Sequence, residues 1–373
     1  MSWYLTKDDL IPIALGAAVL GTGGGGDPYI GRLLAEEAIA EKDLLVMDVD
    51  EVADSEWVIP IAAMGAPTVL LEKIPAGPEP IIAFQALEKE LGIRAQAVCA
   101  MEAGGVNSMV PLATAAHLNL PVVDADGMGR AFPEVYMETF HIYGLSGTPA
   151  CVVNEWGDVV TFRAHTNQTL EHYARAVTIR MGGHAFLSHF AMQGTDLKRT
   201  AVRGTLGFAK RLGEAVLRVE KTHRDPIAAL LKAARTPPYG GADIIFVGKI
   251  VDVQRRTSGG FARGRVLIDG TDDYFTRRMR IEFQNENLVA VMDERPVVTV
   301  PDLITVLDRE NGTPITTEYL HYGQRVTVLA IAAPPIMKSP EALLVWGPEA
   351  FGYSYPYLEP HFIRANNPEI EGR

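Results

Sequence analysis

The chain has 373 residues, of which 47% are hydrophobic and 21% charged, and its formal net charge is −12. This composition is typical of a globular protein with a substantial core. The acidic balance excludes a protein that relies on a basic face to bind the phosphate backbone of a nucleic acid. Two cysteines exclude a disulfide-rich scaffold, and their spacing matches no zinc motif.

A glycine-rich stretch lies near the N-terminus, with five glycines between positions 21 and 26. It contains the pattern G-x-G-x-x-G, but a dinucleotide loop follows a strand. Here residues 7–20 have the apolar spacing of a helix, and Thr6 and Asp9 are placed for a capping box. Asp27 and Pro28 are typical of the start of a second helix. We therefore expect a helix–loop–helix whose loop either lines a ligand pocket or forms only a tight turn.

Strands and helices alternate in the next part of the chain. We predict strands at 44–49, 57–63, 95–101 and 121–123, and helices at 78–91 and 108–118. This alternation predicts parallel strand pairing with helices covering the sheet. Two antiparallel strands are expected at 150–154 and 159–164.

The rest of the chain is first helical and then rich in strands. We predict helices at 170–179, 197–219 and 226–234, and strands at 244–253, 264–268, 277–283, 288–292, 297–300, 324–331 and 343–346. The predicted fold class is α/β, with an N-terminal α/β domain containing a mostly parallel sheet and a β-rich C-terminal domain after intervening helices. The expected divisions are 1–168, 169–358 and a tail at 359–373, whose last four residues match a protease-cleavage linker.

Carboxylates follow two of the predicted parallel strands. Glu102 begins the segment Glu-Ala-Gly-Gly-Val-Asn, and Asp124 begins Asp-Ala-Asp-Gly-Met-Gly-Arg-Ala-Phe-Pro-Glu. Ligands of open parallel sheets bind beyond the carboxyl ends of the strands. If these strands are neighbours, Glu102, Asp124 and Asp126 converge, which raises one pKa or recruits a cation. The simpler alternative for each acid is a helix N-cap.

This arrangement defines a candidate site. Arg130 is a candidate counter-charge or fork for a substrate carboxylate, and glycine N–H groups could cradle a ligand. The catalytic candidates are Glu102, Asp124, Asp126 and Arg130. The substrate-binding candidates are Gly23, Gly24, Gly25, Gly26, Asp27, Gly104, Gly105, Asn107, Gly127 and Glu134. A divalent metal such as zinc has Glu102, Asp126 and His141 as candidate ligands, although no spacing is diagnostic of a metal site.

Arg255 and Arg256 precede a predicted glycine hairpin in the β-rich part. They are either solvated arginines or part of an arm that covers the site of the first domain.

Several motifs together resemble a known family. They are Gly21–Pro28, Glu102–Asn107, Asp124–Glu134, Pro301–Ile304 and Gly347–Tyr353. In this order they resemble the bacterial family formerly known as DUF917, now associated with S-methyl thiohydantoin desulfurase and hydantoin utilisation. The resemblance implies an α/β domain, a β-rich domain, and a hydrolase in which water replaces the methylthio group of a thiohydantoin. It supplies no catalytic residue.

The candidate residues suit this chemistry, because hydrolysis needs an activated water and a general base, or a metal that acidifies the water. Two other functions stay open: an accessory subunit of a hydantoinase-type system, and a nucleotide-binding enzyme that uses the glycine loop. We expect a small heterocyclic substrate, a homo-oligomer and no bound nucleotide. Without a signal peptide or an apolar membrane segment in the sequence, we also expect a cytoplasmic protein.

Overall fold

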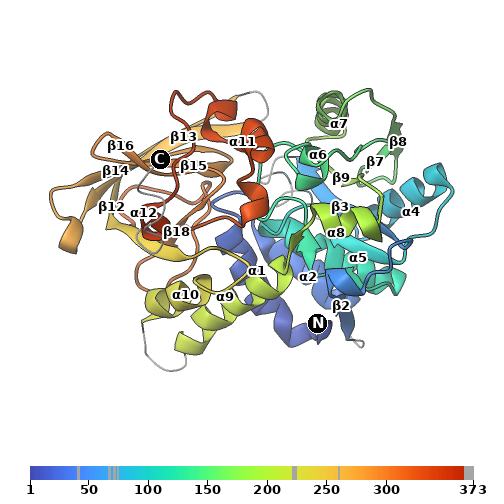
Figure 1. Cartoon of the computed structure of the whole chain (residues 1–373), viewed down its shortest axis with the longest axis horizontal. Coiled ribbons are helices and arrows are strands. Elements are labelled where there is room, and N and C mark those ends of the chain that lie inside the picture. Colours follow the sequence, from blue (N-terminus) through green and yellow to red (C-terminus); the bar gives the residue numbers. More distant parts are fainter. Residues whose placement is uncertain are drawn as a thin grey trace.

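The computed structural model describes residues 1–39, 43–65, 69, 73, 75–220, 225–258 and 261–364. An N-terminal half built on a mixed sheet lies beside a C-terminal half built on an antiparallel sheet (Figure 1). The predicted combination of an α/β part and a β-rich part is confirmed. Among the described helices, none has the length and apolar character needed to span a bilayer.

The N-terminal sheet is parallel only at its centre. Its order is β1 (Trp3–Leu5), β2 (Leu44–Met47), β5 (Val122–Val123), β4 (Ala97–Ala100), β3 (Trp57–Gly65), β9 (His184–Ser188), β7 (Ala150–Val153) and β8 (Val159–Phe162). Parallel pairing joins β2, β5, β4 and β3, and the other pairs are antiparallel, including that of β10 (Met192–Gln193) with β3. The strands β9 and β10, which follow residue 168, also belong to this sheet.

The two faces of the sheet pack against different layers because successive side chains of a strand alternate. Val98 of β4 lies in the cluster formed with α1 (Leu10–Leu20), α2 (Pro28–Ala38), α4 (Glu79–Leu91) and α5 (Val110–Leu118). Ala97 and Cys99 face the other way, toward Phe140 of α6 (Thr139–Ile142) and Leu197 of α8 (Gly194–Thr200). Both cysteines are free and buried.

The predicted helix–loop–helix around the glycines is present. The Thr6 backbone N–H donates to Asp9 Oδ2 at 2.9 Å before α1, and the Tyr29 N–H donates to Asp27 Oδ1 at 2.9 Å at the start of α2. The glycine run therefore joins two helices and does not follow a strand.

The predicted helix at 197–219 is instead two helices, α8 and α9 (Thr205–Glu220). Between them the chain is extended and forms β11 (Val202–Arg203), which pairs with β6 (Ala125–Asp126). Gly204 then takes a φ of 71°, in the left-handed region that a continuous helix does not use. The helices α7 (Asn167–Arg180) and α10 (Pro226–Ala234) lie where they were expected.

The C-terminal sheet is antiparallel throughout. Its order is β16 (Arg295–Thr299), β15 (Glu286–Met292), β14 (Arg278–Gln284), β13 (Phe261–Gly270), β12 (Ala242–Ser258), β18 (Arg325–Ile331) and β17 (Leu303–Asp308). The prediction missed β17 and was wrong at 343–346, which belongs to the helix α11 (Pro340–Trp346). Ser339 caps α11, since its Oγ accepts from the Ala342 N–H at 3.2 Å. A run of four apolar residues does not show whether the segment is a strand or part of a buried helix.

Short elements complete the chain. These are the 3₁₀ turns η1 (Lys7–Asp9), η2 (Val49–Glu51), η3 (Gly105–Ser108), η4 (Asp272–Tyr274), η5 (Pro335–Met337) and η6 (Pro348–Phe351), and the helix α12 (His361–Arg364).

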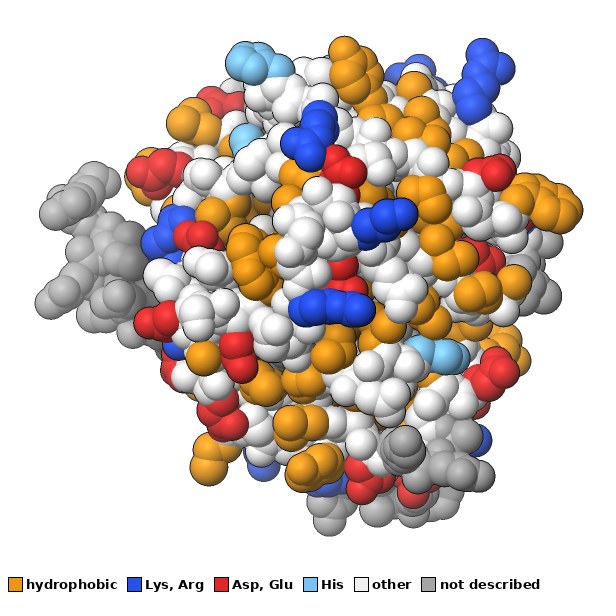
Figure 2. Space-filling view, turned by 90° about the vertical axis from the view of Figure 1, so that its right-hand side faces the viewer, with side chains coloured by type: hydrophobic (Ala, Val, Ile, Leu, Met, Phe, Trp, Pro, Cys, Tyr) orange, Lys and Arg blue, Asp and Glu red, His pale blue; other side chains and the backbone are white. Residues whose placement is uncertain are grey.

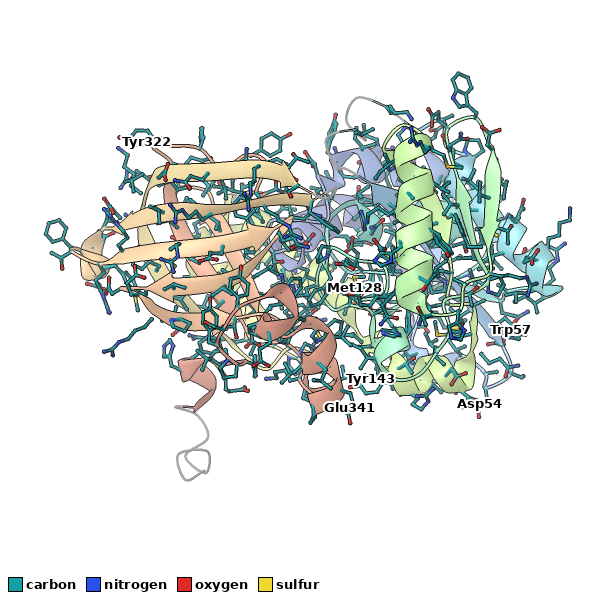
Figure 3. The ribbon with its side chains drawn as sticks, turned by 90° about the horizontal axis from the view of Figure 1, so that it is seen from above. Asp54, Trp57, Met128, Tyr143, Tyr322 and Glu341 are labelled. Carbon is teal, nitrogen blue, oxygen red and sulfur yellow. The ribbon has the colours of Figure 1, made fainter. Side chains whose placement is uncertain are left out.

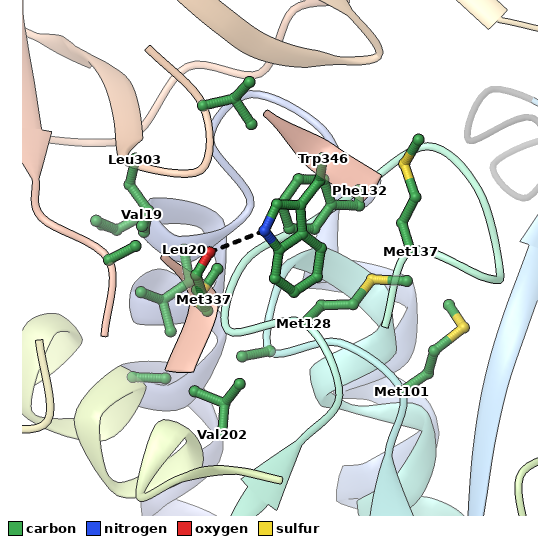
Figure 4. Close-up of a cluster of buried hydrophobic side chains, with 14 of the residues drawn as sticks. Val19, Leu20, Met101, Met128, Phe132, Met137, Val202, Leu303, Met337 and Trp346 are labelled. Atoms are coloured by element: carbon green, nitrogen blue, oxygen red, sulfur yellow. Dashed lines mark hydrogen bonds between the residues drawn. The ribbon is translucent and has the colours of Figure 1, made fainter. Parts of the chain in front are cut away.

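A shared apolar core joins the two halves. Trp346 of α11 is fully buried, and its ring stacks on Phe132, with the centroids 4.5 Å apart and the planes 4° from parallel (Figure 4). Its Nε1 donates to the Met337 carbonyl at 2.9 Å. Nearby, the Tyr143 hydroxyl donates to the Ile336 carbonyl at 2.6 Å, and Figure 3 shows Tyr143 beside Glu341 of α11. The C-terminal segment therefore supports a loop of the N-terminal half.

We expect Trp346→Ala to lower the free energy of unfolding by about 3–5 kcal/mol, because it removes a fully buried aromatic ring and leaves a cavity. Chemical denaturation measures the loss. The control is Trp156→Ala, because Trp156 is 82% exposed; its effect should stay within about 0.5 kcal/mol. Similar losses in the two variants would contradict the assignment of Trp346 to the shared core.

Candidate active site

A cavity of about 70 Å³ lies between the two halves. It is lined by the glycine-rich loop, the end of β3, the loop that follows β4, the segment from Phe132 to Val135, the start of β9, α7, and the turn between β14 and β15. Its polar lining comes from Glu102, Asn107, Glu134, Arg175, His184, Asn285 and Glu286, and Met64, Met101 and Phe132 supply apolar surface. Residues of both halves are needed to form this cavity.

Glu102 is held by the loop that follows β4. Its Oε1 accepts from Asn107 Nδ2 at 2.7 Å, and its Oε2 accepts from the Phe132 N–H at 3.3 Å. Asn107 also bridges to the end of β3, because its Oδ1 accepts from the Ala63 N–H at 2.6 Å. Burial and the nearby Glu286 raise the pKa of Glu102 well above its usual range.

Glu286 approaches the same cavity from the first residue of β15. Burial raises the pKa of Glu286 to about 8, although the charge of Arg130 and the Gly25 N–H favour its ionised form. Within the part of the chain that the structure describes, its Oε2 has no hydrogen-bond partner. Glu102 and Glu286, hereafter the glutamate pair, repel each other when both are ionised, so the pair favours holding one proton.

His184, the first residue of β9, adds a neutral imidazole to the lining. Burial, together with the charge of Lys73, lowers the pKa of His184 to about 4. The ring packs edge-on against Phe186, with the centroids 5.1 Å apart. No described residue makes a hydrogen bond to its Nε2. A ligand in the cavity can supply the missing partner.

Arg175 and Glu134 lie on the α7 side of the cavity. Arg175 pairs with Glu171 and donates from Nη2 to the Pro133 carbonyl at 3.0 Å. Its guanidinium also covers the ring of Phe261, 4.7 Å from the centroid. Burial raises the pKa of Glu134, and the nearby Glu171 adds to the rise.

The contact between Arg175 and Phe261 tests the prediction that Arg255 and Arg256 belong to an arm that covers the site. The hairpin of β12 and β13 reaches the N-terminal half through Phe261. Arg255 instead donates to the carbonyls of Thr317 and Leu320, the latter at 3.3 Å, within its own half. Arg256 lies on the surface, so the interpretation of solvated arginines holds for it.

The glycine run allows close packing of backbone and side chain. A Cβ on Gly24 would lie 2.2 Å from Glu286 Oε1, and a Cβ on Gly105 would lie 2.1 Å from the Gly25 carbonyl oxygen. The Val106 N–H donates to that same carbonyl at 2.9 Å. The run therefore lies against the loop after β4 and against Glu286, whose carboxyl group occupies the space beside Gly24. These contacts and the preceding helix argue against a dinucleotide loop.

The structure brings only some of the predicted binding residues to the cavity. Gly25, Gly26, Asn107 and Glu134 line it. The other predicted binding residues do not line the cavity. Asp27 caps α2. The remaining glycines lie behind the lining: Gly23, Gly24, Gly104, Gly105 and Gly127.

Asp126 and Asp124 do not join Glu102 in the cavity. Asp126 Oδ2 accepts from the N–H groups of Ala103, Met128 and Gly129 at 2.7, 3.1 and 2.7 Å, and burial raises the pKa of Asp126 to about 7. Asp124 Oδ1 accepts from the Gly207 N–H at 3.0 Å, toward α9. The predicted convergence is therefore only partial: Asp126 lies behind Glu102, where its charge adds to the rise in the pKa of Glu102, and Asp124 points away. The reason is that β5 ends at Val123 and the chain then leaves the sheet to pair with β11.

Arg130 is fully buried and bonds to protein groups. It donates from Nε to the Ala131 carbonyl at 3.1 Å, from Nη1 to the Asp302 carbonyl at 2.9 Å, and from Nη2 to Thr22 Oγ1 at 2.7 Å and the Asn287 carbonyl at 2.8 Å. The prediction that Arg130 is a fork for a substrate carboxylate is therefore not supported. Burial lowers the pKa of Arg130 to about 10, so it is charged at neutral pH.

The three candidate metal ligands do not lie together. His141 Nδ1 pairs with Asn167 Nδ2 at 2.9 Å on the outer side of α6, while Glu102 and Asp126 accept hydrogen bonds from backbone N–H groups. Over the described ranges, no three His, Cys, Asp or Glu side chains are grouped so that they could hold a metal ion.

Sequence reasoning missed Glu286, His184, Arg175 and Asn285. Glu286 lies between two apolar runs and has asparagines on both sides, a pattern that indicates a hairpin turn. His184 follows two glycines and precedes the apolar run of β9. This position at the start of a strand was the one sequence signal that pointed to His184.

Comparisons with known proteins agree with this architecture. Family models described as the N-terminal and C-terminal domains of S-Me-THD-like proteins match residues 8–164 and 165–360. A crystal structure of a protein from Chromobacterium violaceum is similar to the chain with a TM-score of 0.81 and 26% sequence identity, over 95% of this chain and 99% of that one. No curated protein matches the chain significantly. Since the two family models together cover nearly its whole length, the chain belongs to the S-Me-THD-like family.

Proposed function

We propose that the protein is a hydrolase of small five-membered heterocycles of the S-methyl thiohydantoin class, in which water replaces the methylthio group. The observation that carries this proposal is the glutamate pair, two buried carboxyls from different halves beside one small cavity. A pair that holds one proton can act as base and acid in the same turnover. Membership of the family supports the substrate class.

The two members of the pair have different surroundings. Glu102 accepts hydrogen bonds from Asn107 and Phe132, which favour its carboxylate. Glu286 has an oxygen, Oε2, without a partner among the described groups, and its pKa is raised to about 8. Burial and the nearby Glu286 raise the pKa of Glu102 as well, but these two hydrogen bonds oppose the rise, and the pair holds one proton between its members. We therefore assign that proton to Glu286, the acid, and the role of base to Glu102.

The reaction balances with these two groups. Glu102 takes a proton from water as the water oxygen bonds to the ring carbon that carries sulfur, and Glu286 gives its proton to the adjacent ring nitrogen. The intermediate then returns its hydroxyl proton to Glu286 and forms the carbonyl. The carbon–sulfur bond breaks, and the leaving sulfur takes the proton held by Glu102, which releases a thiol and restores both carboxyls.

Other residues of the cavity would hold the ring. His184 is neutral and its Nε2 is unpaired, so it can exchange a hydrogen bond with a ring carbonyl or N–H. Phe132, Met64 and Met101 supply apolar surface for the methylthio group. Arg130 makes no direct contact with the cavity, but its charge favours the ionised forms of both members of the glutamate pair.

The direct test is thiol release from S-methyl thiohydantoins by the purified protein, with metal analysis of the same sample and size-exclusion chromatography for the expected homo-oligomer. Turnover that survives a chelator would show that the chemistry needs no bound metal. A protein without turnover that co-purifies with a hydantoinase-type partner would favour the accessory-subunit alternative.

We expect Glu102→Gln and Glu286→Gln each to lower kcat by about 10²–10⁴-fold, because each removes a proton-transfer group and keeps the shape of the side chain. The matched control is Glu88→Gln. Glu88 is also a buried glutamate that accepts a backbone N–H, from Ala95 at 2.8 Å, but it lies outside the cavity. Full activity in either site variant would contradict the mechanism.

Glu286 should also set the alkaline limit of activity. Because it acts as the acid, kcat/KM should fall as the pH rises through about 8, the pKa to which burial raises it. A pH–rate profile measures this limb, and the residual activity of Glu286→Gln should lack it. If Glu286→Gln kept the same fall in kcat/KM above pH 8, the fall would belong to another titrating group.

The same pKa has a consequence for stability. Between the ordinary pKa of a glutamate and about 8, the folded protein holds a proton on Glu286 that the unfolded chain has released. The free energy of unfolding therefore falls as the pH rises through this range. Over this pH range, the free energy of unfolding of wild type should fall further than that of Glu286→Gln, which has no carboxyl to titrate. Chemical denaturation at several pH values measures the difference.

Gly24→Ala should lower turnover at least about tenfold, because its Cβ would overlap Glu286 Oε1 and push that carboxyl from its position. The control is Gly92→Ala, because Gly92 has open space around it although its φ is 67°. That variant should lose stability but keep its kcat. Equal kcat values for the two variants in the thiol-release assay would contradict a role of Gly24 in placing Glu286.

A further inference from the structure

We propose that a groove on the C-terminal half is a second binding site, which takes an organic ligand bearing a multiply charged oxyanion. The groove has a volume of about 610 Å³ and lies over β12, β13 and β14, beside the segment that follows η6. It is separate from the cavity that holds the glutamate pair. Its features point to a ligand with both negative charge and an apolar or ring-shaped part.

Three exposed arginines on one face of the sheet carry the charge of the groove. Arg256 of β12 lies directly opposite Arg263 of β13, and Arg265 lies two residues further along β13, on the same face. Like charges directly opposite each other on antiparallel strands destabilise the sheet. The chain as a whole has a net charge of −12, so a cluster of positive charge departs from its average surface.

The protein offers these charges little compensation. The one acidic side chain among the described lining residues is Glu282, whose Oε1 already accepts from Arg280 Nε at 2.9 Å. Gln254, another lining residue, donates to Asp252 at 3.0 Å. In the described chain, Arg256, Arg263 and Arg265 form no ion pair; the Arg263 guanidinium lies 5.9 Å from the centroid of the Phe261 ring and near Tyr353. An oxyanion would supply the missing negative charge in the geometry that guanidinium groups favour.

The opposite side of the groove is aromatic. Phe351 and Tyr353 line it, and the Tyr353 ring stacks on Tyr355 with the centroids 5.5 Å apart. Tyr353 also hydrogen-bonds Glu282, which lies opposite Arg265 in the strand register and pairs with Arg280, so this one carboxylate is shared among several partners. Half-buried rings facing arginines suit an organic anion better than a small inorganic ion, because the rings bind apolar surface while the arginines bind charge.

The surface of the N-terminal half has a different distribution of charge. Figure 2 shows that on the face formed by the N-terminal half, basic and acidic side chains are interspersed. One such pair is Arg163 with Glu90, at 2.6 Å. The groove therefore combines a concave shape with an excess of positive charge over the single carboxylate of Glu282, and both properties focus the electrostatic potential on an anion.

The groove and the cavity are neighbours with separate linings. Gln284 lines the groove, and the next two residues, Asn285 and Glu286, line the cavity. Phe261 lies between Arg263 on the groove side and Arg175 on the cavity side. The anion site is thus independent of the proposed hydrolysis, and each can fail its test without the other.

The test is titration calorimetry at low ionic strength with two probes, pyrophosphate for phosphoryl groups and citrate for carboxylates. Wild type should bind at least one of them, and the preferred probe identifies the class of oxyanion. The double variant Arg256→Ala/Arg265→Ala should weaken binding at least about tenfold, because charge-assisted hydrogen bonds are lost. It leaves the stack of Phe261 between Arg175 and Arg263 intact.

Arg295→Ala is the matched control, because Arg295 is an exposed arginine on the edge strand β16, outside the groove. It should leave the affinity unchanged, and Glu102→Gln should also bind normally. Absence of binding to wild type, unchanged affinity in the double variant, or an equal loss in Arg295→Ala would each overturn the proposal. Circular dichroism confirms that the variants are folded.

Discussion

The buried guanidinium of Arg130 joins the parts of the chain on which the rest of the structure depends. Its hydrogen bonds reach Thr22 in the glycine-rich loop, Asn287 in β15, and Asp302 before β17. A buried charge is costly unless it is fully hydrogen-bonded, so these segments must be positioned together for the folded state to form. Once they are, the same charge lies near Glu286 and Glu102 and limits how far burial can raise their pKa values. One interaction therefore fixes the contact between the halves and the electrostatics of the cavity.

The parts of the fold that local signals determine could be predicted from the sequence. The cap at Asp27 and the apolar spacing before it correctly placed a helix on each side of the glycines, and alternating strands and helices correctly indicated the parallel centre of the first sheet. The pairing of β9 with β3 and β7 could not be predicted, because it joins segments distant in sequence through hydrogen bonds that any strand can make. The wrong prediction at 343–346 has a different cause. Four apolar residues are too few to distinguish helical from strand periodicity, and the helix cap at Ser339 was the better signal.

The site was predictable to the extent that it lies at strand ends. Glu102 and Asn107 were found because an acid and glycines follow a buried strand, and both line the cavity. Asp126 was misplaced because the chain turns out of the sheet after Val123, which no pattern in the sequence marks. Glu286 was missed because its position depends on how the second half packs on the first. A carboxyl pair shared between two halves is a tertiary property, and only one of its members carries a local signature.

The stack of Phe132 on Trp346 has a consequence for how the protein is made. Phe132 leaves the ribosome long before Trp346, and until α11 has been synthesised the face of the Phe132 ring that stacks on Trp346 has no cover. During that interval the nascent chain exposes a core surface of the kind that chaperones recognise and that promotes aggregation. The delay also keeps the cavity incomplete, since β15 and α11 are both translated late. The core shared by the two halves and the cavity are therefore completed together, late in translation.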